Sequence, residues 1–514
     1  MRLLAVAAAT ALLAPPVASA TAPHEPLGHE GRWITDARGR VVVLHGAAVV
    51  PDGFTKPLET AEEAGFAKAD AKLLARHGFN LVRLGAFYGA YEREPGSFSD
   101  DYLDSFARTQ RLLARTGIFT LFEFHQDMLN PRYQGRGFAD WFIRDDGYPN
   151  APQAGFPGNY FLNSALNRAY DNLWANAAGP DGVGVQDHFA EGWRRAAARF
   201  AERRRIAGYD ILNEPWPGSE WPTCANTEGC PPGGFDATEL TDFHNRVIAA
   251  IRRADRRHTV YYEPNLQFDV GAKTTHGKVA DPNAGFSFHN YCLGAAPGLP
   301  HAPDPAELCK DQGERRVFQN AEDHVAQTGA TLLMTEFGDV QDATIHRRVT
   351  ELADEFMVGW TVWGWFRAAG QIKQDPAKPP TRDNVNQEVL AAVVRPYPRV
   401  VAGTPTRYAF DAETKRFEAS FTTRMPNGRR ARRRRSEIYV PRLHYGRDYR
   451  LAVRGAEVTR GFGRQRVELR ACRGAKKVTV VVTDDRQRHR PRCRRARARS
   501  GGPAGSGRLE ARSP

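Results

Sequence analysis

The chain lacks an internal apolar run long enough to cross a bilayer. Its one continuous apolar stretch lies at the N-terminus, from Leu3 to Leu13, and is both too short and followed by Pro15 and Pro16. Arg2 before this stretch and the small residues of 18–20 after it are typical of a secretory signal peptide. We therefore predict a signal peptide over residues 1–20 and a secreted, extracellular protein.

Paired metal-binding motifs are also missing. No two tight cysteine pairs occur, and no two histidines have His-x-His or His-x-x-x-His spacing. We predict no metal site and no cofactor. A metallohydrolase, the alternative, would have to gather isolated ligands from separate strands, namely His45, His125, Asp127 and His289.

Cysteines are few, with six among 514 residues. In an exported protein they favour disulfides over metal binding. Six cysteines allow about fifteen pairings, and the sequence alone proves none of them. Nearness along the chain favours Cys224–Cys230, Cys292–Cys309 and Cys472–Cys493, each closing a small loop.

Acidic residues are scarce in the last part of the chain. Residues 401–514 hold 31 Lys and Arg against 10 Asp and Glu, whereas residues 1–400 hold 41 against 49. The net charge of +13 is thus a C-terminal property, concentrated in residues 429–435 and 486–499. No nucleic-acid-reading motif accompanies this charge, so we predict no nucleic-acid partner. The charge favours an anionic membrane or cell-envelope surface, with a merely solvated tail as the alternative.

The central region alternates short apolar runs with longer amphipathic stretches. Apolar strands separated by such helices indicate a parallel sheet with helices outside, and eight units indicate a closed (β/α)8 TIM barrel. We place this barrel at residues 30–396. The expected strands are 41–47, 80–87, 119–125, 206–215, 259–265, 286–292, 331–338 and 356–366, and the expected helices are 61–77, 100–116, 188–204, 237–253, 314–328 and 342–355.

The pattern changes after Pro398. Short runs with period-two alternation follow at 408–410, 416–422, 437–440, 449–453, 466–470 and 477–482. They predict a small antiparallel β-sandwich over residues 400–484. The Arg-rich tail, residues 485–514, has nothing apolar to bury and is expected to be disordered.

Two glutamates end strand-like runs of the predicted barrel. Glu214 closes the run that begins at Ile206, and Glu336 closes the run that begins at Thr331. The carboxyl ends of barrel strands build the active site, and a pair of carboxyls is what cleavage of a glycosidic bond requires. Most glutamates are instead salt-bridged surface residues, and that is the alternative here.

A long insertion separates the third and fourth predicted strands. It carries many aromatic residues between glycines and prolines, from Tyr133 to Phe161. Long structured loops on this face of a barrel usually shape a binding site. We expect most of these aromatic rings to hold the insertion on the barrel and a minority to line an apolar trough, joined by Trp216, Trp221 and Phe235.

The motifs resemble those of family 5 glycoside hydrolases. The matching residues are Arg83, His125, Asn213-Glu214-Pro215, His289, Tyr291, Glu336 and Trp363, each near a predicted strand end. Within the family, the chain most resembles endoglycosylceramidases. That likeness rests on His125-Gln126-Asp127, Lys56, residues 213–218, residues 335–338 and the appended β-domain, and it covers residues 30–485.

The resemblance implies a role for each matching residue. Glu214 would be the general acid/base and Glu336 the nucleophile of a retaining mechanism, supported by Arg83. Glu263, also at a strand end, is a rival acid that we expect to be structural. The residues implied to bind substrate are Lys56, His125, Asp127, Asn213, His289, Tyr291 and Trp363.

The resemblance also implies a glycosphingolipid substrate, cut between oligosaccharide and ceramide by a monomeric secreted enzyme. An endo-β-glucanase or a mannanase with the same catalytic pair is the alternative within the family. A catalytically silent glycolipid-binding protein is the alternative outside enzymes.

Overall fold

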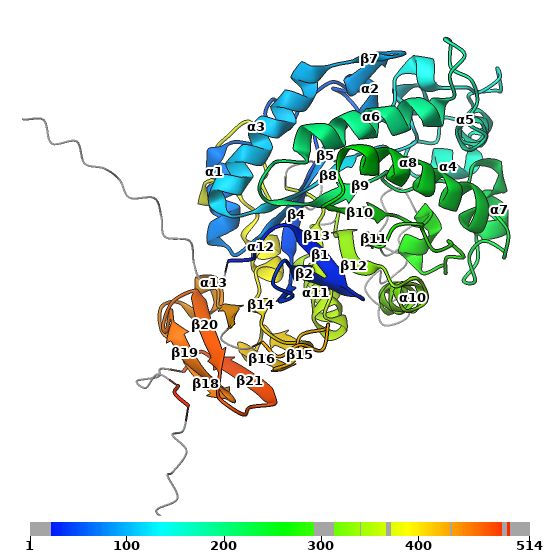
Figure 1. Cartoon of the computed structure of the whole chain (residues 1–514). Coiled ribbons are helices and arrows are strands. Elements are labelled where there is room, and N and C mark those ends of the chain that lie inside the picture. Colours follow the sequence, from blue (N-terminus) through cyan, green and yellow to red (C-terminus); the bar gives the residue numbers. More distant parts are fainter. Residues whose placement is uncertain are drawn as a thin grey trace, which may run out of the picture.

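The computed structural model describes residues 22–291, 313–339, 341–365, 372–431, 434–485 and 491–493. A helix-covered barrel forms the larger part of the molecule, and a smaller β-domain lies against one end of it (Figure 1). The predicted signal peptide, the Cys292–Cys309 pair and nearly all of the predicted tail lie outside the described residues.

The barrel closes from eight strands in the order β10-β11-β12-β13-β4-β5-β8-β9, all paired in parallel. Every residue of these strands is buried, because helices cover the outside and side chains fill the inside. The predicted TIM barrel is confirmed. Its strands are β4 His45–Val49, β5 Leu81–Ala86, β8 Phe119–Phe124, β9 Ile206–Asp210, β10 Thr259–Tyr262, β11 Ala284–Asn290, β12 Thr331–Phe337 and β13 Gly359–Val362.

The covering helices follow local sequence signals. α3 begins where the Ser99 side chain accepts the backbone N–H of Tyr102, and it ends at Gly117, whose φ is 83°. The predicted helix 61–77 begins only at Lys68, because residues 61–65 form a turn. The helices are α1 Lys68–Arg76, α3 Asp100–Thr116, α6 Val185–Phe200, α8 Thr241–Ala254, α10 Gly313–Thr328, α11 Ala343–Phe356 and α12 Gln387–Val393.

The long insertion between β8 and β9 is mostly helical and turn structure. α4 Gly158–Leu162 and α5 Ser164–Trp174 are its helices ahead of α6. The remaining short elements are α2 Tyr88–Tyr91, β6 Glu92–Glu94, β7 Ser97–Phe98, α7 Trp221–Cys224, α13 Arg442–Tyr445, the 3-10 turns η1 Pro131–Tyr133, η2 Asp140–Phe142, η3 Gly218–Glu220, η5 Leu266–Val270 and η7 Arg382–Asn384, and the π-helical turn η4 Asp236–Leu240.

The first predicted barrel strand, 41–47, is wrong in its bounds. Val41 and Val42 form β3, which belongs to the sandwich, whereas the barrel strand β4 starts at His45. The chain changes sheets over two residues: Val43 N–H donates to Arg399 O of the sandwich, and Leu44 O accepts from Trp360 N–H of the barrel. The sequence does not reveal this change of sheet, because residues 41–47 are buried in both sheets and therefore read as one apolar run.

The β-domain is a sandwich of two antiparallel sheets. One has seven strands in the order β1-β2-β3-β14-β17-β20-β19, and the other has four in the order β15-β16-β21-β18. Residues 27–42 therefore share the sandwich that the sequence placed at 400–484. The strands are β1 Leu27–Glu30, β2 Trp33–Asp36, β3 Val41–Val42, β14 Tyr397–Val401, β15 Pro405–Asp411, β16 Arg416–Thr422, β17 Arg435–Tyr439, β18 Arg450–Arg454, β19 Ala456–Arg460, β20 Arg466–Ala471 and β21 Lys477–Thr483.

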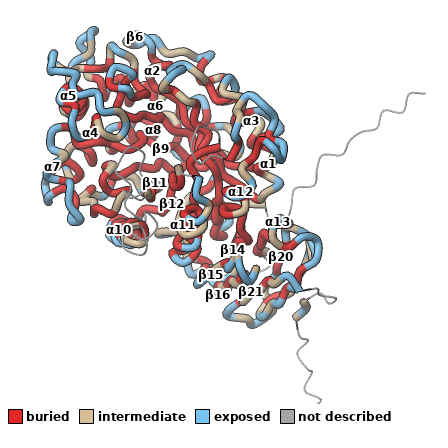
Figure 2. The backbone as a smooth tube through the Cα atoms, turned by 180° about the vertical axis from the view of Figure 1, so that it is seen from behind, coloured by how far each residue is buried: buried red, intermediate tan, exposed pale blue. Residues whose placement is uncertain are grey.

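The sandwich buries one face of its four-stranded sheet. Alternate residues of β16 and β21, such as Phe417, Phe421 and Val480, pack in a core with Tyr397 and Val467 of the other sheet. The tube view shows buried segments running through both the barrel and this domain (Figure 2). The residues between them on each strand consequently face away from the core.

Two of the three predicted disulfides are formed in the described part of the chain. They are Cys224–Cys230 and Cys472–Cys493, both among the pairs that nearness along the chain favours.

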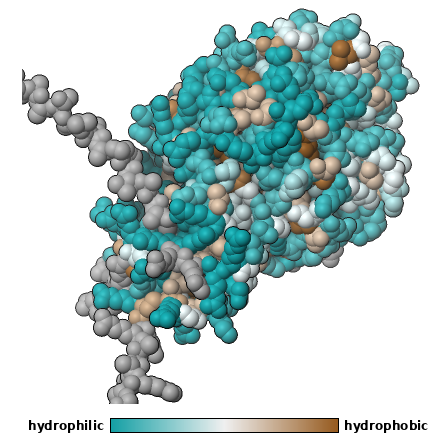
Figure 3. All heavy atoms as spheres, in the orientation of Figure 1, coloured by the Kyte–Doolittle hydropathy of each residue, from teal (hydrophilic) through white to brown (hydrophobic). Residues whose placement is uncertain are grey.

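Within the described part of the chain, no helix has the length and apolarity that a bilayer span needs. The face shown in Figure 3 is mostly hydrophilic, with scattered apolar residues.

Candidate active site

Glu214 and Glu336 meet at the carboxyl end of the barrel. Glu336 lies in β12, and Glu214 lies four positions after the end of β9. Their carboxylate oxygens and a ring nitrogen of His289 all lie within 4.8 Å of one another. Glu214 is 5% exposed and Glu336 3% exposed. The two carboxyls are thus close enough for one of them to attack a sugar carbon whose leaving group the other protonates, a separation of about 5–5.5 Å in retaining enzymes.

Glu214 is held by its own backbone. Its φ of 44° lies in the left-handed region, which costs free energy for a residue other than glycine. Its N–H donates to Glu263 Oε2 at 2.8 Å, and its carbonyl oxygen accepts from Gln126 Nε2 at 3.0 Å. Tyr170 O–H in turn donates to Gln126 Oε1 at 2.8 Å. Two neighbouring strand ends and helix α5 therefore fix this conformation.

Arg83 organises the carboxylates on the other side. It donates to Glu336, and Tyr291 O–H donates to the second oxygen of Glu336 at 2.8 Å. The same guanidinium lies 2.6 Å from Glu123, 2.9 Å from Asp210 and 2.7 Å from Glu263. It also donates to Asn213 Oδ1 at 3.1 Å.

Sequence reasoning missed two members of this network. Glu123 and Asp210 lie within apolar barrel strands and are fully buried. Burying an ionised carboxylate inside such a strand costs free energy unless a cation pairs with it. The acidic residues in these apolar runs therefore indicated a buried basic partner inside the barrel.

The pKa values of Glu214 and His289 are both raised in this site. Burial, with help from the charge of Glu336, raises the pKa of Glu214 to about 7, although its contact with His289 opposes this. Burial would lower the pKa of His289, but the charges of Glu263 and Glu336 outweigh it and raise that pKa well above its usual value. Glu214 is therefore neutral and able to donate a proton below about pH 7, beside an imidazolium.

Glu263 has the opposite behaviour. Burial alone would raise its pKa, yet the charges of His289 and Arg83 lower it to about 2. A carboxyl that stays ionised cannot be the proton donor. This supports the structural role expected for Glu263 and leaves Glu214 as the acid.

A second cluster lies beside this pair. The His125 ring stacks on the Trp363 ring with centroids 5.2 Å apart, and His125 Nε2 lies 3.4 Å from Asp127 Oδ2. Arg136 Nε donates to Asp127 at 2.5 Å, and its Nη1 donates to Asp52 O at 2.8 Å. Burial would raise the pKa of Asp127, but the charge of Arg136 and the contact with His125 lower it.

Arg136 is a further residue that the sequence did not single out. It is buried in the insertion between Gly135 and Gly137, where an added Cβ would collide with backbone or side-chain atoms of residues 126–128. A buried arginine flanked by glycines is a recognisable sign of a tightly packed cationic anchor.

Lys56 is not brought into contact with the other predicted site residues. Its side chain is 66% exposed, and Nζ pairs with Glu59 at 2.8 Å. The loop that carries it follows β4, and Arg136 holds the start of that loop through Pro51 O and Asp52 O.

The four ligands that the metallohydrolase alternative requires, His45, His125, Asp127 and His289, do not come together as one group. His45 stacks between Trp360 and Tyr397 at the opposite end of the barrel, with centroids 4.3 Å and 3.9 Å away. Glu214, His289 and Glu336 have suitable ligand atoms, but His289 Nδ1 already bonds Glu214 Oε1 at 2.7 Å.

The aromatic insertion is more exposed than expected. Four of its eight rings between Tyr133 and Phe161 are buried, and three are exposed, namely Tyr148, Phe156 and Phe161. Phe161 is 39% exposed and packs edge-on against both Trp216 and Trp221, each 5.2 Å away. Trp216 and Trp221 stack with centroids 6.0 Å apart. Trp216 itself is fully buried, and Phe235 is buried against Trp174, so neither of these two predicted trough residues reaches the surface.

Comparison with known families decides the assignment. The description "Cellulase (glycosyl hydrolase family 5)" fits residues 47–368, and "Glycoside hydrolase family 5 C-terminal domain" fits residues 395–482. The chain belongs to glycoside hydrolase family 5. It is accordingly a glycoside hydrolase by family, with the (β/α)8 barrel and the appended β-domain of other family 5 members.

Individual relatives agree with the family 5 assignment. Endoglycoceramidase I of Rhodococcus hoagii (strain 103S) is 32% identical over 463 residues, covering 88% of this chain and 87% of the relative. An endoglycoceramidase of Cyanea nozakii is 25% identical over 459 residues, covering 82% and 86%. The solved structure of endo-glycoceramidase II from Rhodococcus sp. has a TM-score of 0.71 at 24% identity, covering 88% of this chain and 99% of that one, which shows the shared fold.

Proposed function

We propose that this family 5 member is a retaining endoglycosidase that cleaves glycosphingolipids between the oligosaccharide and the ceramide. The observation that carries the proposal is the juxtaposition of a neutral Glu214 and an Arg83-paired Glu336 within 4.8 Å. The names of the relatives, endoglycoceramidases from two organisms, support the substrate class.

In the first step Glu336 attacks the anomeric carbon and Glu214 protonates the departing oxygen. Arg83 and the Tyr291 hydroxyl hold the two oxygens of Glu336, which orients the carboxylate for attack. The covalent bond to Glu336 removes negative charge from the site. Glu214 then loses the repulsion that helped to keep its proton, so it becomes a better base.

In the second step Glu214, now ionised, takes a proton from water that attacks the glycosyl-enzyme. His289 Nδ1 at 2.7 Å stabilises the ionised form of Glu214. The sugar leaves with its original anomeric configuration, and Glu214 regains its proton.

The glycone would lie against the second cluster. Asp127 and His125 offer polar groups for sugar hydroxyls, Asn213 can reach the 2-hydroxyl, and Trp363 can stack on a sugar face. Lys56 would have to turn from Glu59 to join them. The apolar leaving group would lie along Phe161 and Trp221, which are partly exposed and pack against the buried Trp216.

Two alternatives make different demands. An endo-β-glucanase or mannanase needs tryptophan platforms that alternate with polar groups along a cleft, whereas Phe161 and Trp221 pack edge-on against each other as one apolar contact. A silent glycolipid-binding protein would not need the opposed titration of Glu214 and Glu263.

Mass spectrometry of the products from lactosylceramide tests the proposal. Free ceramide and an intact disaccharide are expected. Sequential monosaccharides would contradict endo cleavage, and hydrolysis of cellulose or mannan without hydrolysis of the glycolipid would favour the polysaccharide alternative.

We also propose that the protein is secreted, works as a monomer and associates with anionic membranes. The N-terminal sequence supports export. The charge of the C-terminal part supports attraction to an anionic surface. Detection of a processed N-terminus in the culture medium of the native host tests secretion. Analytical ultracentrifugation tests the monomeric state.

A further inference from the structure

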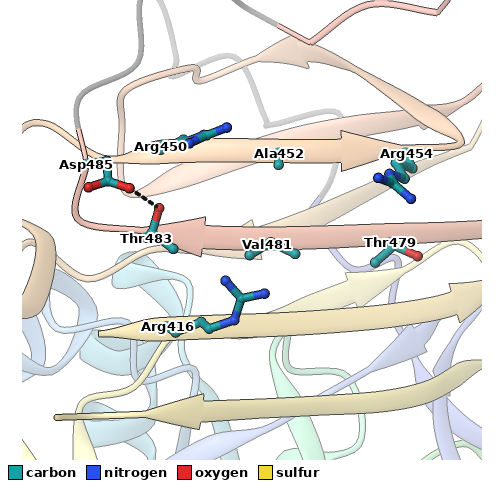
Figure 4. Close-up of a pocket in the computed structure, with 8 residues that line it drawn as sticks. All are labelled: Arg416, Arg450, Ala452, Arg454, Thr479, Val481, Thr483 and Asp485. Atoms are coloured by element: carbon teal, nitrogen blue, oxygen red, sulfur yellow. Dashed lines mark hydrogen bonds between the residues drawn. The ribbon is translucent and has the colours of Figure 1, made fainter. Parts of the chain in front are cut away.

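A groove of about 450 Å³ crosses the outer face of the four-stranded sheet of the β-domain (Figure 4). Its floor consists of Thr479, Val481 and Thr483 of β21. Its sides carry Arg416 of β16 and Arg450 and Arg454 of β18. None of these residues belongs to the active site.

Strand register explains the groove. Arg450 lies opposite Thr483, Ala452 opposite Val481 and Arg454 opposite Thr479. Because side chains alternate along a strand, these six point to the same outer face, with the small Ala452 between the two arginines. Figure 4 shows the Arg450 side chain extended along the strand toward Ala452. The gap above Ala452 and Val481 is therefore open and flanked by guanidinium groups.

The charges of the groove are only partly neutralised. Arg416 pairs with Glu418, and Asp485 accepts a hydrogen bond from Thr483 at one end. Arg450 and Arg454 are both exposed, and neither forms an ion pair within the described part of the chain. Two planar cations over a floor of small hydroxyl and aliphatic side chains suit a tetrahedral or planar anion.

The lining also excludes a common alternative. No aromatic ring lines the groove, so it lacks the stacking platform on which a neutral sugar would rest. Recognition must rest on charge and on hydroxyl donors.

We propose that this groove binds the phosphate of an anionic phospholipid headgroup and so attaches the β-domain to a bilayer. The inference rests on the proposed lipid substrate, which would be presented in such a bilayer. Arg450 and Arg454 donate to the phosphate oxygens from one side, and Thr479 donates from the floor. The attachment is separate from catalysis and leaves the barrel mouth unchanged.

The test compares two double variants in the full-length protein. Arg450→Gln/Arg454→Gln removes the groove cations. Arg460→Gln/Arg464→Gln removes two exposed arginines from the β19–β20 hairpin, which belongs to the other sheet of the same domain, and is the matched control. Sedimentation with phosphatidylcholine vesicles, with and without phosphatidylglycerol, measures binding, and melting temperatures check folding.

The wild type is expected to bind the phosphatidylglycerol vesicles, and excess glycerol 3-phosphate is expected to release it. The groove variant should bind roughly 10- to 30-fold more weakly, as expected for two arginines near an anionic surface, while the control changes less than about threefold. Equal losses in both variants, or an unchanged groove variant, would overturn the proposal. Loss only after removal of residues 494–514 would also overturn it, because binding would then belong to the tail.

Activity on detergent-dispersed lactosylceramide separates this inference from the proposed function. The groove variant should retain wild-type activity there, because its substitutions lie outside the barrel. If the wild type binds vesicles through the groove but cleaves no glycolipid, the proposed substrate fails and the lipid site stands. If it cleaves glycolipid without groove-dependent binding, the lipid site fails alone.

Discussion

At the scale of single residues, Arg83 is a buried cation that several carboxylates of the site share. One buried guanidinium contacts Glu123, Asp210, Glu263 and Glu336, which come from four different strands or strand ends. A planar group with five donors can serve four carboxylates at once, whereas an ammonium group has only three donors.

We expect Arg83→Lys to lower kcat by roughly 100-fold or more and to reduce the free energy of unfolding by about 3–5 kcal/mol. The lysine keeps the charge but leaves some buried carboxylates unpaired. Enzyme kinetics and urea denaturation measure the two effects. Arg108→Lys, at an exposed pair with Glu62, is the control and should change neither.

Glu214→Gln should abolish cleavage of glycolipids, whose leaving group needs a proton. Synthetic glycosides with acidic phenol leaving groups should still form the glycosyl-enzyme, because they leave without protonation. A burst of phenol followed by slow turnover is the expected time course, and equal loss on both substrates would contradict the assignment of Glu214 as acid.

The same variant should change the pH dependence of stability. The folded-state pKa of Glu214 is raised to about 7, so the contribution of this one group to stability falls as the pH rises from about 4.5 through 7. Glu214→Gln removes this loss, and it should be more stable than the wild type by up to about 3 kcal/mol at pH 8, with no gain at pH 4. Denaturant midpoints at both pH values measure the difference.

At the scale of elements, the hairpin β2–β3 joins the sandwich through a buried ion pair. Arg40 donates to Asp36 at 2.7 Å and to Arg435 O of β17 at 3.2 Å. Asp36 is 3% exposed, so it has little access to water as a substitute partner.

Arg40→Ala should therefore cost about 3–5 kcal/mol of unfolding free energy, because it leaves a buried carboxylate without its cation. Arg40 lies far from Glu214 and Glu336 in the fold, so kcat should be unchanged well below the melting temperature. A thermal melt and an activity assay test this pair of expectations. Arg40→Ala/Asp36→Ala should recover part of the loss, and failure to recover would show that the hairpin depends on the arginine's other contacts.

At the scale of the whole molecule, acid should destabilise the barrel through histidines on its outer side. His244, His276 and His324 are buried around Tyr262, and burial lowers the pKa of His276 to about 4 and of His324 to about 3. Unfolded histidines bind protons below about pH 6.5, so stability is lost as the pH falls from 6.5 toward 4.

At pH 5 each of these two histidines should cost about 2 kcal/mol relative to neutral pH. Denaturant midpoints between pH 4.5 and 7 measure the slope. His324→Gln should flatten that slope while it keeps a hydrogen-bonding group near Tyr262 O–H. An unchanged slope would place the acid sensitivity elsewhere.

Sequence patterns predicted the barrel and the meeting of Glu214 with Glu336 at its carboxyl end, because apolar strands and the residues that end them are strong local signals. The helix expected at 100–116 has its observed bounds because Ser99 and Gly117 cap it. The sequence could not reveal that Val41–Val42 and His45–Val49 belong to different sheets, since both are apolar. Asp210 was missed because its partner Arg83 lies 127 positions away in the sequence. Arg136 was missed because its hold on the loop after β4 depends on Asp52, 84 positions away.

Strands from before and after the barrel form one sheet of the β-domain. β3 from the N-terminal side pairs with β14, which follows the barrel and continues through β17 and β20. In the sequence the barrel therefore lies between two parts of the β-domain, and removing the residues after 396 would take β14 away from β3 and expose a bare strand edge. A transplanted barrel therefore needs the residues on both sides of it, β1–β3 before it and the strands from β14 onward after it, to keep this sheet complete.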